Sequence, residues 1–378
     1  MNALEVVLIS LERWDDVWRR NQYLVDGVLG HDPDSRVLFI EPPRDGLHDL
    51  LHGRAFGRGL GLRRHEAYDG RLHLFQPTKL IPRLFGAAAD ALLRHHVRSA
   101  VRQVGMRHPV LWVNDANGAG LVRSTRWPAI YDITDDWLAA ARPRRELARL
   151  RRNEDILFRE CREIVVCSAG LASSRGQRRR VTLIPNAVSL SRYRVPTQRP
   201  PDLPRGSAVY VGTIHEDRLD VELVVRTAHA LRASGEGVVL VGPDALSAAN
   251  RESLLSAGVK LLGARHFSMV PAYLQNAEVL IVPHVVDAFT DSLDPIKLYE
   301  YLAVGRPIVS TPVAGFRESG ADGLRVVERT QFPAAVAAAV GHPAPTITRA
   351  DVPDWSDRFG AMISVLDAVR RSGSAEPS

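Results

Sequence analysis

The residues best suited to bind an anionic ligand lie in a segment that carries a helix signal at each end. Asp294 is a good N-cap, Pro295 suits the first helical position, and Gly305 followed by Pro307 ends a helix. The first turn of a helix exposes unpaired N–H groups at the positive end of the helix dipole, which favours an anion. The sequence therefore predicts an anion site formed by Asp294, Pro295, Ile296, Lys297 and Leu298.

Two side chains add chemistry to this predicted helix. Lysine is rare in the chain, with 3 lysines against 46 arginines, and Lys297 stands three residues before Glu300 on the same helix face. Together with the helix terminus they offer a phosphate cradle, a cation and a carboxylate that can accept hydrogen bonds from the vicinal hydroxyls of a sugar. This combination indicates a nucleoside diphosphate site, and the alternative is an ordinary surface ion pair.

Several strand-like runs upstream of this helix end in glycine. Val209 to Val211 leads into Gly212 and Thr213, with Arg218 shortly after, and Val239 to Val241 leads into Gly242. Glycine lets the backbone approach a phosphate closely, and arginine adds positive charge. Repetition of the pattern within one region indicates a nucleotide-binding half.

Strand-like and helical patterns alternate along the whole chain, which predicts an α/β protein with doubly wound, Rossmann-like domains and parallel sheets. The 378 residues suit two domains facing a cleft, although residues 42–70 show no clean period and predict an irregular excursion. The predicted divisions are an N-terminal domain over 1–186, a proline-rich linker over 187–207, a C-terminal domain over 208–354, a helix over 355–370 that packs back on the N-terminal domain, and a disordered tail over 371–378.

Composition narrows the class of protein. Residues 1–185 hold 30 Arg and Lys against 22 Asp and Glu, a net charge of +8, which suits an anionic membrane surface or a phosphorylated acceptor, or is simply a solvated surface. The interleaved basic and aromatic residues of single-strand nucleic-acid modules are absent, so nucleic acid is not an expected partner. Two cysteines and the lack of a long apolar run favour a cytoplasmic protein without disulfides.

In their order along the chain, the motifs resemble those of glycosyltransferase family 4 of the GT-B fold. Their residues resemble those of its bacterial surface-polysaccharide branch, including transferases of the teichuronic acid type. In chain order the motifs are Leu183 to Val188, Tyr210 to Gly212, Leu240 to Gly242, Leu262-Gly263, Tyr273 to Pro283 and Lys297 to Thr311. The resemblance covers about residues 181–320, and the first half of the chain is similar mainly in architecture.

The resemblance implies a retaining transfer of a sugar from a nucleotide diphosphate sugar to an acceptor hydroxyl, with the donor in the C-terminal domain. Glu300 would accept from the ribose hydroxyls, and Arg218 with Lys297 would hold the diphosphate. No cofactor and no metal is expected, because cationic side chains and helix N-termini neutralise the leaving group. This chain departs from the family pattern in having Ser292 where a second glutamate is usual.

The N-terminal half departs from the pattern as well, because the expected histidine is replaced by the carboxylates that follow Tyr131. We expect Asp135, and less so Asp132, to orient the acceptor hydroxyl or to receive its proton, while the alternative is that Asp135 and Asp136 cap the next helix. Arg20 lies where the loop after the first strand opens a helix, and it suits an anionic acceptor or the donor phosphates.

Three functions fit these observations. The first is a glycosyltransferase acting on a lipid-linked glycan or a small-molecule secondary metabolite, with peripheral membrane contact through the basic N-terminal half. The second is a nucleotide-sugar epimerase, which would alter the donor without an acceptor. The third is a non-catalytic sugar- or partner-binding module, which the serine at 292 and the missing histidine would suit.

Overall fold

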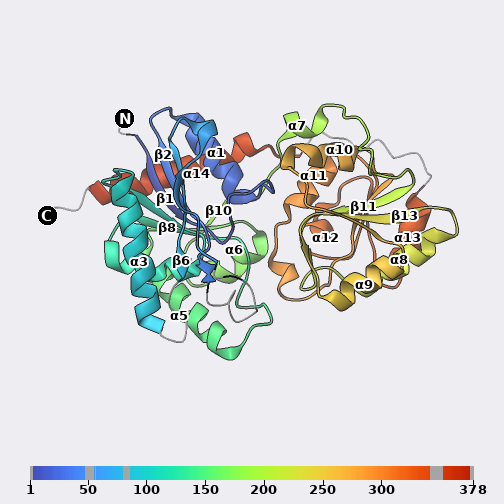
Figure 1. Cartoon of the computed structure of the whole chain (residues 1–378), viewed down its shortest axis with the longest axis horizontal. Coiled ribbons are helices and arrows are strands. Elements are labelled where there is room, and N and C mark those ends of the chain that lie inside the picture. Colours follow the sequence, from blue (N-terminus) through green and yellow to red (C-terminus); the bar gives the residue numbers. More distant parts are fainter. Residues whose placement is uncertain (1–2, 47–54, 56, 80–85, 341–351, 375–378) are drawn as a thin grey trace. The chain divides into compact units, whose positions relative to one another are not determined.

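The computed structural model describes residues 3–46, 55, 57–79, 86–340 and 352–374, without the side chains of 86–89, 373 and 374 (Figure 1). The chain divides into two compact units. The first, Met1–Pro185 with Ser356–Ser378, is called the N-terminal unit, and the second, Asn186–Trp355, the C-terminal unit. The residues predicted as a linker over 187–207 belong to the C-terminal unit instead, because Tyr193 and Leu203 are buried in its core.

The N-terminal unit is built on an eight-stranded sheet whose strands are parallel except at one edge. Its strand order is β10 (Thr182–Leu183), β9 (Glu163–Val166), β8 (Ala129–Ile133), β7 (Val110–Val113), β1 (Glu5–Ile9), β2 (Arg36–Ile40), β5 (Leu72–Gln76) and β4 (Gly61–Arg64). Residues 42–70 are expected to be irregular, but Gly61–Arg64 of this stretch form the antiparallel edge strand β4, whose backbone is satisfied by pairing with β5. Residues 47–54 and 56 of the same stretch lie outside the described residues. A small ladder joins β3 (Arg44–Asp45) to β6 (Thr78–Lys79).

Helices cover both faces of this sheet because successive strand residues point to opposite sides. On one face Tyr131 and Ile133 share a core cluster with α3 (Gly86–Gln103), α4 (Ala119–Thr125), α5 (Arg144–Glu160) and α6 (Ala169–Gly176). On the other face α1 (Arg20–His31) reaches Asp132 of β8 through Arg20. The C-terminal helix α14 (Trp355–Ser374) lies against α1, since the ring of Phe359 contacts Gly27 (Figure 1).

The C-terminal unit holds a six-stranded parallel sheet. Its order is β15 (Lys260–Gly263), β13 (Gly237–Val241), β11 (Ser207–Val211), β16 (Val279–Val282), β17 (Ile308–Ser310) and β18 (Leu324–Val326). One core cluster joins it to α8 (Val221–Arg232), α9 (Ala248–Ser256) and α13 (Phe332–Ala339), and a second to α7 (Leu190–Arg194), α10 (Val270–Gln275), α11 (Ile296–Val304) and α12 (Phe316–Ser319). A short ladder pairs β12 (Ile214–His215) with β14 (Asp244–Ala245).

Two sheets, parallel apart from the edge strand β4 and each layered between helices, confirm the predicted fold class. The last helix is longer than predicted: α14 continues to Ser374, so residues 371–374 are helical, and residues 375–378 of the predicted tail lie outside the described residues. Among the helices that the structure describes, none combines the length and the apolar composition needed to span a bilayer.

Candidate functional site

Two glycine turns lie against each other at the carboxyl ends of β11 and β13. Gly212 has φ 147° and Gly242 has φ 150°, a backbone region that residues with a Cβ rarely adopt. A Cβ added at Gly242 would overlap the carbonyl oxygen of Gly212. The two predicted glycine positions are thus brought together, and their contact requires glycine.

Lys297 joins these turns from the first turn of α11. A Cβ added at Gly212 would come within 2.5 Å of the Lys297 Nζ atom, and this Nζ lies 4.8 Å from the ring centroid of Tyr210. Tyr210 is buried on β11. The lysine therefore holds its charge beside the backbone that the sequence predicts to approach phosphate.

A histidine that is not among the predicted site residues lies beside the same cations. His284 follows β16 and is 5% exposed, and its Nε2 atom is 3.2 Å from the Tyr210 hydroxyl. Burial, with added repulsion from Lys297 and Arg218, holds the pKa of His284 well below its usual value. The imidazole is therefore neutral, and Arg218 and Lys297 both act on it electrostatically.

Arg218 itself is placed by the loop that follows β16. Its guanidinium lies over the ring of Phe289, 5.2 Å from the centroid, and its carbonyl accepts a hydrogen bond from the Val285 backbone N–H. Thr213, between Gly212 and β12, accepts at its carbonyl a 3.3 Å hydrogen bond from Tyr210. An aromatic side chain thus contacts each of them: Tyr210 the glycine turn and Phe289 the Arg218 guanidinium.

The start of α11 differs from the prediction. The helix begins at Ile296 and Pro295 takes the N-cap position, without a side-chain cap. Asp294 does not cap, because its Oδ2 accepts from the Asn186 N–H at 2.5 Å and its Oδ1 accepts from the Tyr299 hydroxyl at 2.7 Å. The Leu298 N–H donates to the Pro295 carbonyl, so the helix terminus shifts by one residue. Gly305 ends the helix at φ 70°, as predicted.

Glu300 is oriented by a residue from the predicted linker. Its Oε1 atom accepts a 2.5 Å hydrogen bond from the hydroxyl of Tyr193, which lies in α7. Burial raises the pKa of Glu300, while the Tyr193 hydrogen bond and the charge of Lys297 act against that rise. Only the fold brings Tyr193 here, since 107 residues separate the two and no local pattern marks the pairing.

In the N-terminal unit the predicted carboxylates separate into two environments. Asp132 is fully buried and accepts from Arg20, 3.3 Å away, and from the Trp112 indole N–H at 3.1 Å. Arg20 is 4% exposed. The predicted roles of Asp132 and Arg20 toward a ligand are therefore corrected: both are closed into an ion pair inside the unit, as the inward face of β8 dictates.

Asp135 lies in a different place, at the wall of a polar cavity of about 350 Å³. Its Oδ2 accepts a 3.1 Å hydrogen bond from the hydroxyl of Thr134, which also contacts the Asn114 amide. These residues follow the carboxyl ends of β7 and β8, the sheet edge where open α/β folds bind ligands. Asp136, by contrast, is paired with Arg175.

Comparison with known proteins relates this architecture to sugar transfer. Residues 205–342 match the family model described as glycosyl transferases group 1. The Bacillus subtilis protein TuaH, named for a glycosyltransferase of teichuronic acid biosynthesis, is 26% identical over 338 residues, which are 82% of this chain and 81% of TuaH. The chain is a GT-B glycosyltransferase.

Solved structures of GT-B enzymes share the transferase's fold over nearly its whole length. Sucrose-phosphate synthase of Thermosynechococcus elongatus matches with a TM-score of 0.63 and 15% identity, covering 98% of this chain and 97% of that one. An α,α-trehalose-phosphate synthase of Burkholderia vietnamiensis also has a TM-score of 0.63, with 14% identity and coverage of 98% and 100%. The family match falls on the C-terminal unit, where the glycine turns, Lys297 and Glu300 lie.

Proposed function

We propose that the transferase moves a sugar from a nucleoside diphosphate sugar to an acceptor hydroxyl, with retention at the anomeric carbon and without a metal ion. The observation that carries the proposal is the position of Lys297, whose Nζ lies against the Gly212 turn while Arg218 and the N-terminus of α11 stand nearby in the same unit. A diphosphate is bound well where positive charge is held beside a backbone segment that the phosphate oxygens can approach closely.

Two parts of the donor would be bound, namely the diphosphate and the ribose. The diphosphate would lie on the backbone of Gly212 and Thr213, with Lys297, Arg218 and the first N–H groups of α11 supplying positive charge. The ribose hydroxyls would donate to the Glu300 carboxylate, which Tyr193 orients. This assignment extends the predicted diphosphate and ribose roles, and it adds Tyr193 as a positioning residue.

Transfer breaks the bond between the anomeric carbon and the diphosphate oxygen and forms a bond to the acceptor oxygen. Negative charge grows on the departing diphosphate, where Lys297 and the α11 terminus stabilise it without a metal. With retention, the departing phosphate oxygen takes the acceptor's proton on the same face of the sugar. Asp135 then serves to orient the acceptor hydroxyl in the polar cavity, beside Thr134.

The acceptor is proposed to be a bacterial glycan precursor or another hydroxylated molecule bound by the N-terminal unit. The name of TuaH supports a surface-polysaccharide precursor. The arginine excess of residues 1–185 supports peripheral contact with an anionic membrane. Sedimentation with anionic vesicles at low salt, compared with neutral vesicles, tests that contact, and equal recovery with both kinds would contradict it.

The experiment for the donor site is a thermal-shift and calorimetry panel with UDP, GDP, dTDP, ADP and CDP. At least one nucleotide is expected to stabilise the protein, and Lys297→Ala is expected to weaken that binding by about 10- to 100-fold, because a hydrogen bond to a charged group is lost. Lys260→Ala is the matched control, since Lys260 is exposed at the start of β15. Unchanged nucleotide binding in Lys297→Ala would refute the site.

A further inference from the structure

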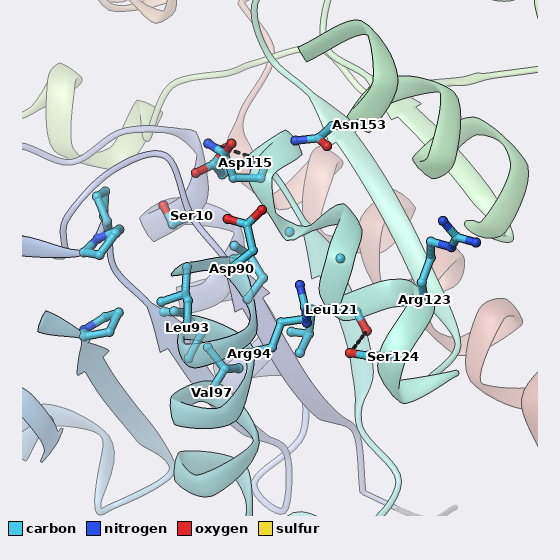
Figure 2. A pocket seen from close by; sticks show the side chains of 18 of the residues that line it. Ser10, Asp90, Leu93, Arg94, Val97, Asp115, Leu121, Arg123, Ser124 and Asn153 are labelled. Atoms are coloured by element: carbon cyan, nitrogen blue, oxygen red, sulfur yellow. Dashed lines mark hydrogen bonds between the residues drawn. The ribbon is translucent and has the colours of Figure 1, made fainter. Parts of the chain in front are cut away.

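A second cavity, of about 420 Å³, lies in the N-terminal unit between helices α3, α4 and α5 and the carboxyl ends of β1 and β2. Figure 2 shows Asp90, Leu93, Arg94 and Val97 of α3 on one side and Leu121 of α4 opposite them. Its volume falls within the range of about 300 to 1,000 Å³ typical of small-molecule sites. It is large enough for a ligand group rather than a single water.

The walls of this cavity are largely apolar. Ile9 and Ile40 close it at the strand ends, and Leu93, Leu121 and Ile156 line it from three different helices. Three prolines that follow β2 and β5 complete the lining, namely Pro42, Pro43 and Pro77. Such walls favour an apolar group, because burying it removes apolar surface from water.

A pair of charged side chains is placed one helical turn apart on α3. Asp90 and Arg94 line the cavity, and among the described residues no hydrogen bond or ion pair joins either side chain to a partner. Arg94 lies close over α4, since a Cβ added at Gly120 would come within 2.9 Å of its Nη1 atom. Both groups therefore remain available to a polar substituent of a ligand.

This apolar cavity adjoins the polar cavity that Asp135 lines. Asp115, Asn117, Pro42 and Pro43 line both, so the two share one wall. That wall is fixed, because Asp115 accepts from the Asn117 backbone and amide N–H groups and Asn117 accepts from Arg149 of α5. Both cavities have polar and apolar lining residues, and charged and amide side chains make up a larger share of the lining of the cavity at Asp135.

We propose that the two cavities together bind an amphipathic acceptor, with its hydroxylated, reacting end at Asp135 and its apolar part between α3, α4 and α5. This inference rests on the proposed function, because it names the acceptor class of the same transferase. The apolar part is either an acyclic isoprenyl-like chain or an aromatic aglycone, and both would be desolvated against the same walls. A purely polar sugar would leave the apolar cavity empty.

The test measures binding of three phosphate monoesters by calorimetry: geranyl phosphate, 1-naphthyl phosphate and glycerol 3-phosphate. Geranyl phosphate carries the isoprenyl chain, naphthyl phosphate carries the aromatic group, and glycerol phosphate carries neither. At least one apolar ester is expected to bind about tenfold or more tightly than glycerol phosphate. The better of the two identifies the source of the apolar group.

Cavity-filling variants test whether the apolar ester binds in the cavity between α3, α4 and α5. Leu93→Trp fills the cavity from α3 and Ser124→Trp fills it from the exposed edge of α4, and each is expected to weaken the apolar ester about tenfold or more. His95→Trp is the matched control, because His95 is exposed on α3 and does not line the cavity. Circular dichroism and melting temperature show whether each variant is folded.

The results separate this inference from the proposed function. Equal affinity for all three esters, or equal affinity of wild type and both folded filling variants, overturns the apolar subsite even where nucleotides bind to the C-terminal unit. Loss of binding in His95→Trp to the same extent as in Leu93→Trp also overturns it. Ester binding in the cavity together with no nucleotide binding overturns the proposed function and, with it, the assignment of the cavity to an acceptor.

Discussion

At the scale of single residues, the structure separates two carboxylates that stand only three positions apart. Asp132 belongs to β8 and points to the face covered by α1, whereas Asp135 has left the strand and reaches a cavity. The sequence shows both as acids after an apolar run. Without the partner Arg20, which comes from 112 residues earlier, no local pattern tells the buried acid from the accessible one.

This difference predicts opposite costs for two similar substitutions. Asp132→Ala is expected to destabilise the protein by about 3 to 5 kcal/mol, because it leaves the buried charge of Arg20 without its partner. Asp135→Ala should cost less than about 1 kcal/mol, since its carboxylate is partly solvated. Urea denaturation measures both, and equal losses in the two variants would contradict the separation.

Glu300 gives the donor site a predicted pH dependence. The carboxylate must be ionised to accept from ribose, and burial raises its pKa while the Tyr193 hydrogen bond opposes the rise. Nucleotide affinity is therefore expected to fall as the pH drops through the pKa of Glu300. Tyr193→Phe removes the opposing hydrogen bond, so the fall should begin at a higher pH.

The measurement is nucleotide affinity by calorimetry between pH 4 and pH 8, with the most stabilising diphosphate of the panel. Glu300→Gln serves as the control, because its amide does not titrate, so the loss of nucleotide affinity at acidic pH that is assigned to Glu300 should vanish. If Tyr193→Phe does not shift the pH at which nucleotide affinity falls, or if Glu300→Gln still loses affinity at acidic pH, another group is responsible.

At the scale of elements, the sequence predicted most strands well because buried parallel strands are short apolar runs bounded by turns. Leu72–Gln76, Ala129–Ile133 and Val279–Val282 are apolar runs of this kind, and each forms a strand in the structure. Helix starts were less certain. Asp294 has the right residue type for an N-cap, but the Asn186 N–H and the Tyr299 hydroxyl occupy its carboxylate, and a distant backbone partner leaves no local signal.

The glycine turns give a prediction that depends on one strand. Gly242→Ala at the end of β13 is expected to destabilise the protein by at least about 2 kcal/mol and to weaken nucleotide binding, because its φ of 150° excludes a Cβ and the added atom meets the Gly212 carbonyl. Gly237→Ala at the start of the same strand has open space and should change stability by less than about 1 kcal/mol. Denaturation and calorimetry compare them, and a tolerated Gly242→Ala would remove the requirement for glycine.

At the scale of the whole molecule, the alternation of strands and helices was enough to predict two doubly wound units, and the proline-rich stretch after residue 186 marked a division. That stretch is not a bare linker. Composition predicted its chain breaks, but it did not show that Tyr193 packs into the C-terminal core. The last helix is a similar case. An amphipathic pattern predicts α14, but only tertiary contacts show that α14 packs on α1.

Helix α14 packs on α1 in the N-terminal unit, and glycine-to-alanine substitutions at two positions of α1 test this contact. Gly27→Ala is expected to destabilise the N-terminal unit by about 1 to 2 kcal/mol, because the new methyl group overlaps the Phe359 ring of α14 and the overlap outweighs the helix propensity gained. Gly30→Ala, exposed and with no atom within 4 Å, should instead stabilise by up to about 1 kcal/mol.

Thermal and urea unfolding give the two signs, and the double variant Gly27→Ala with Phe359→Ala assigns the cause. If the ring is the obstacle, removing it should make the Gly27→Ala step neutral or stabilising, so the two substitutions would be strongly non-additive. Additive losses would mean that α14 does not lie on α1 at Gly27. In that case the predicted return of the C-terminal helix to the N-terminal unit would have to rest on other contacts, such as the hydrogen bond between Arg162 and Ser372.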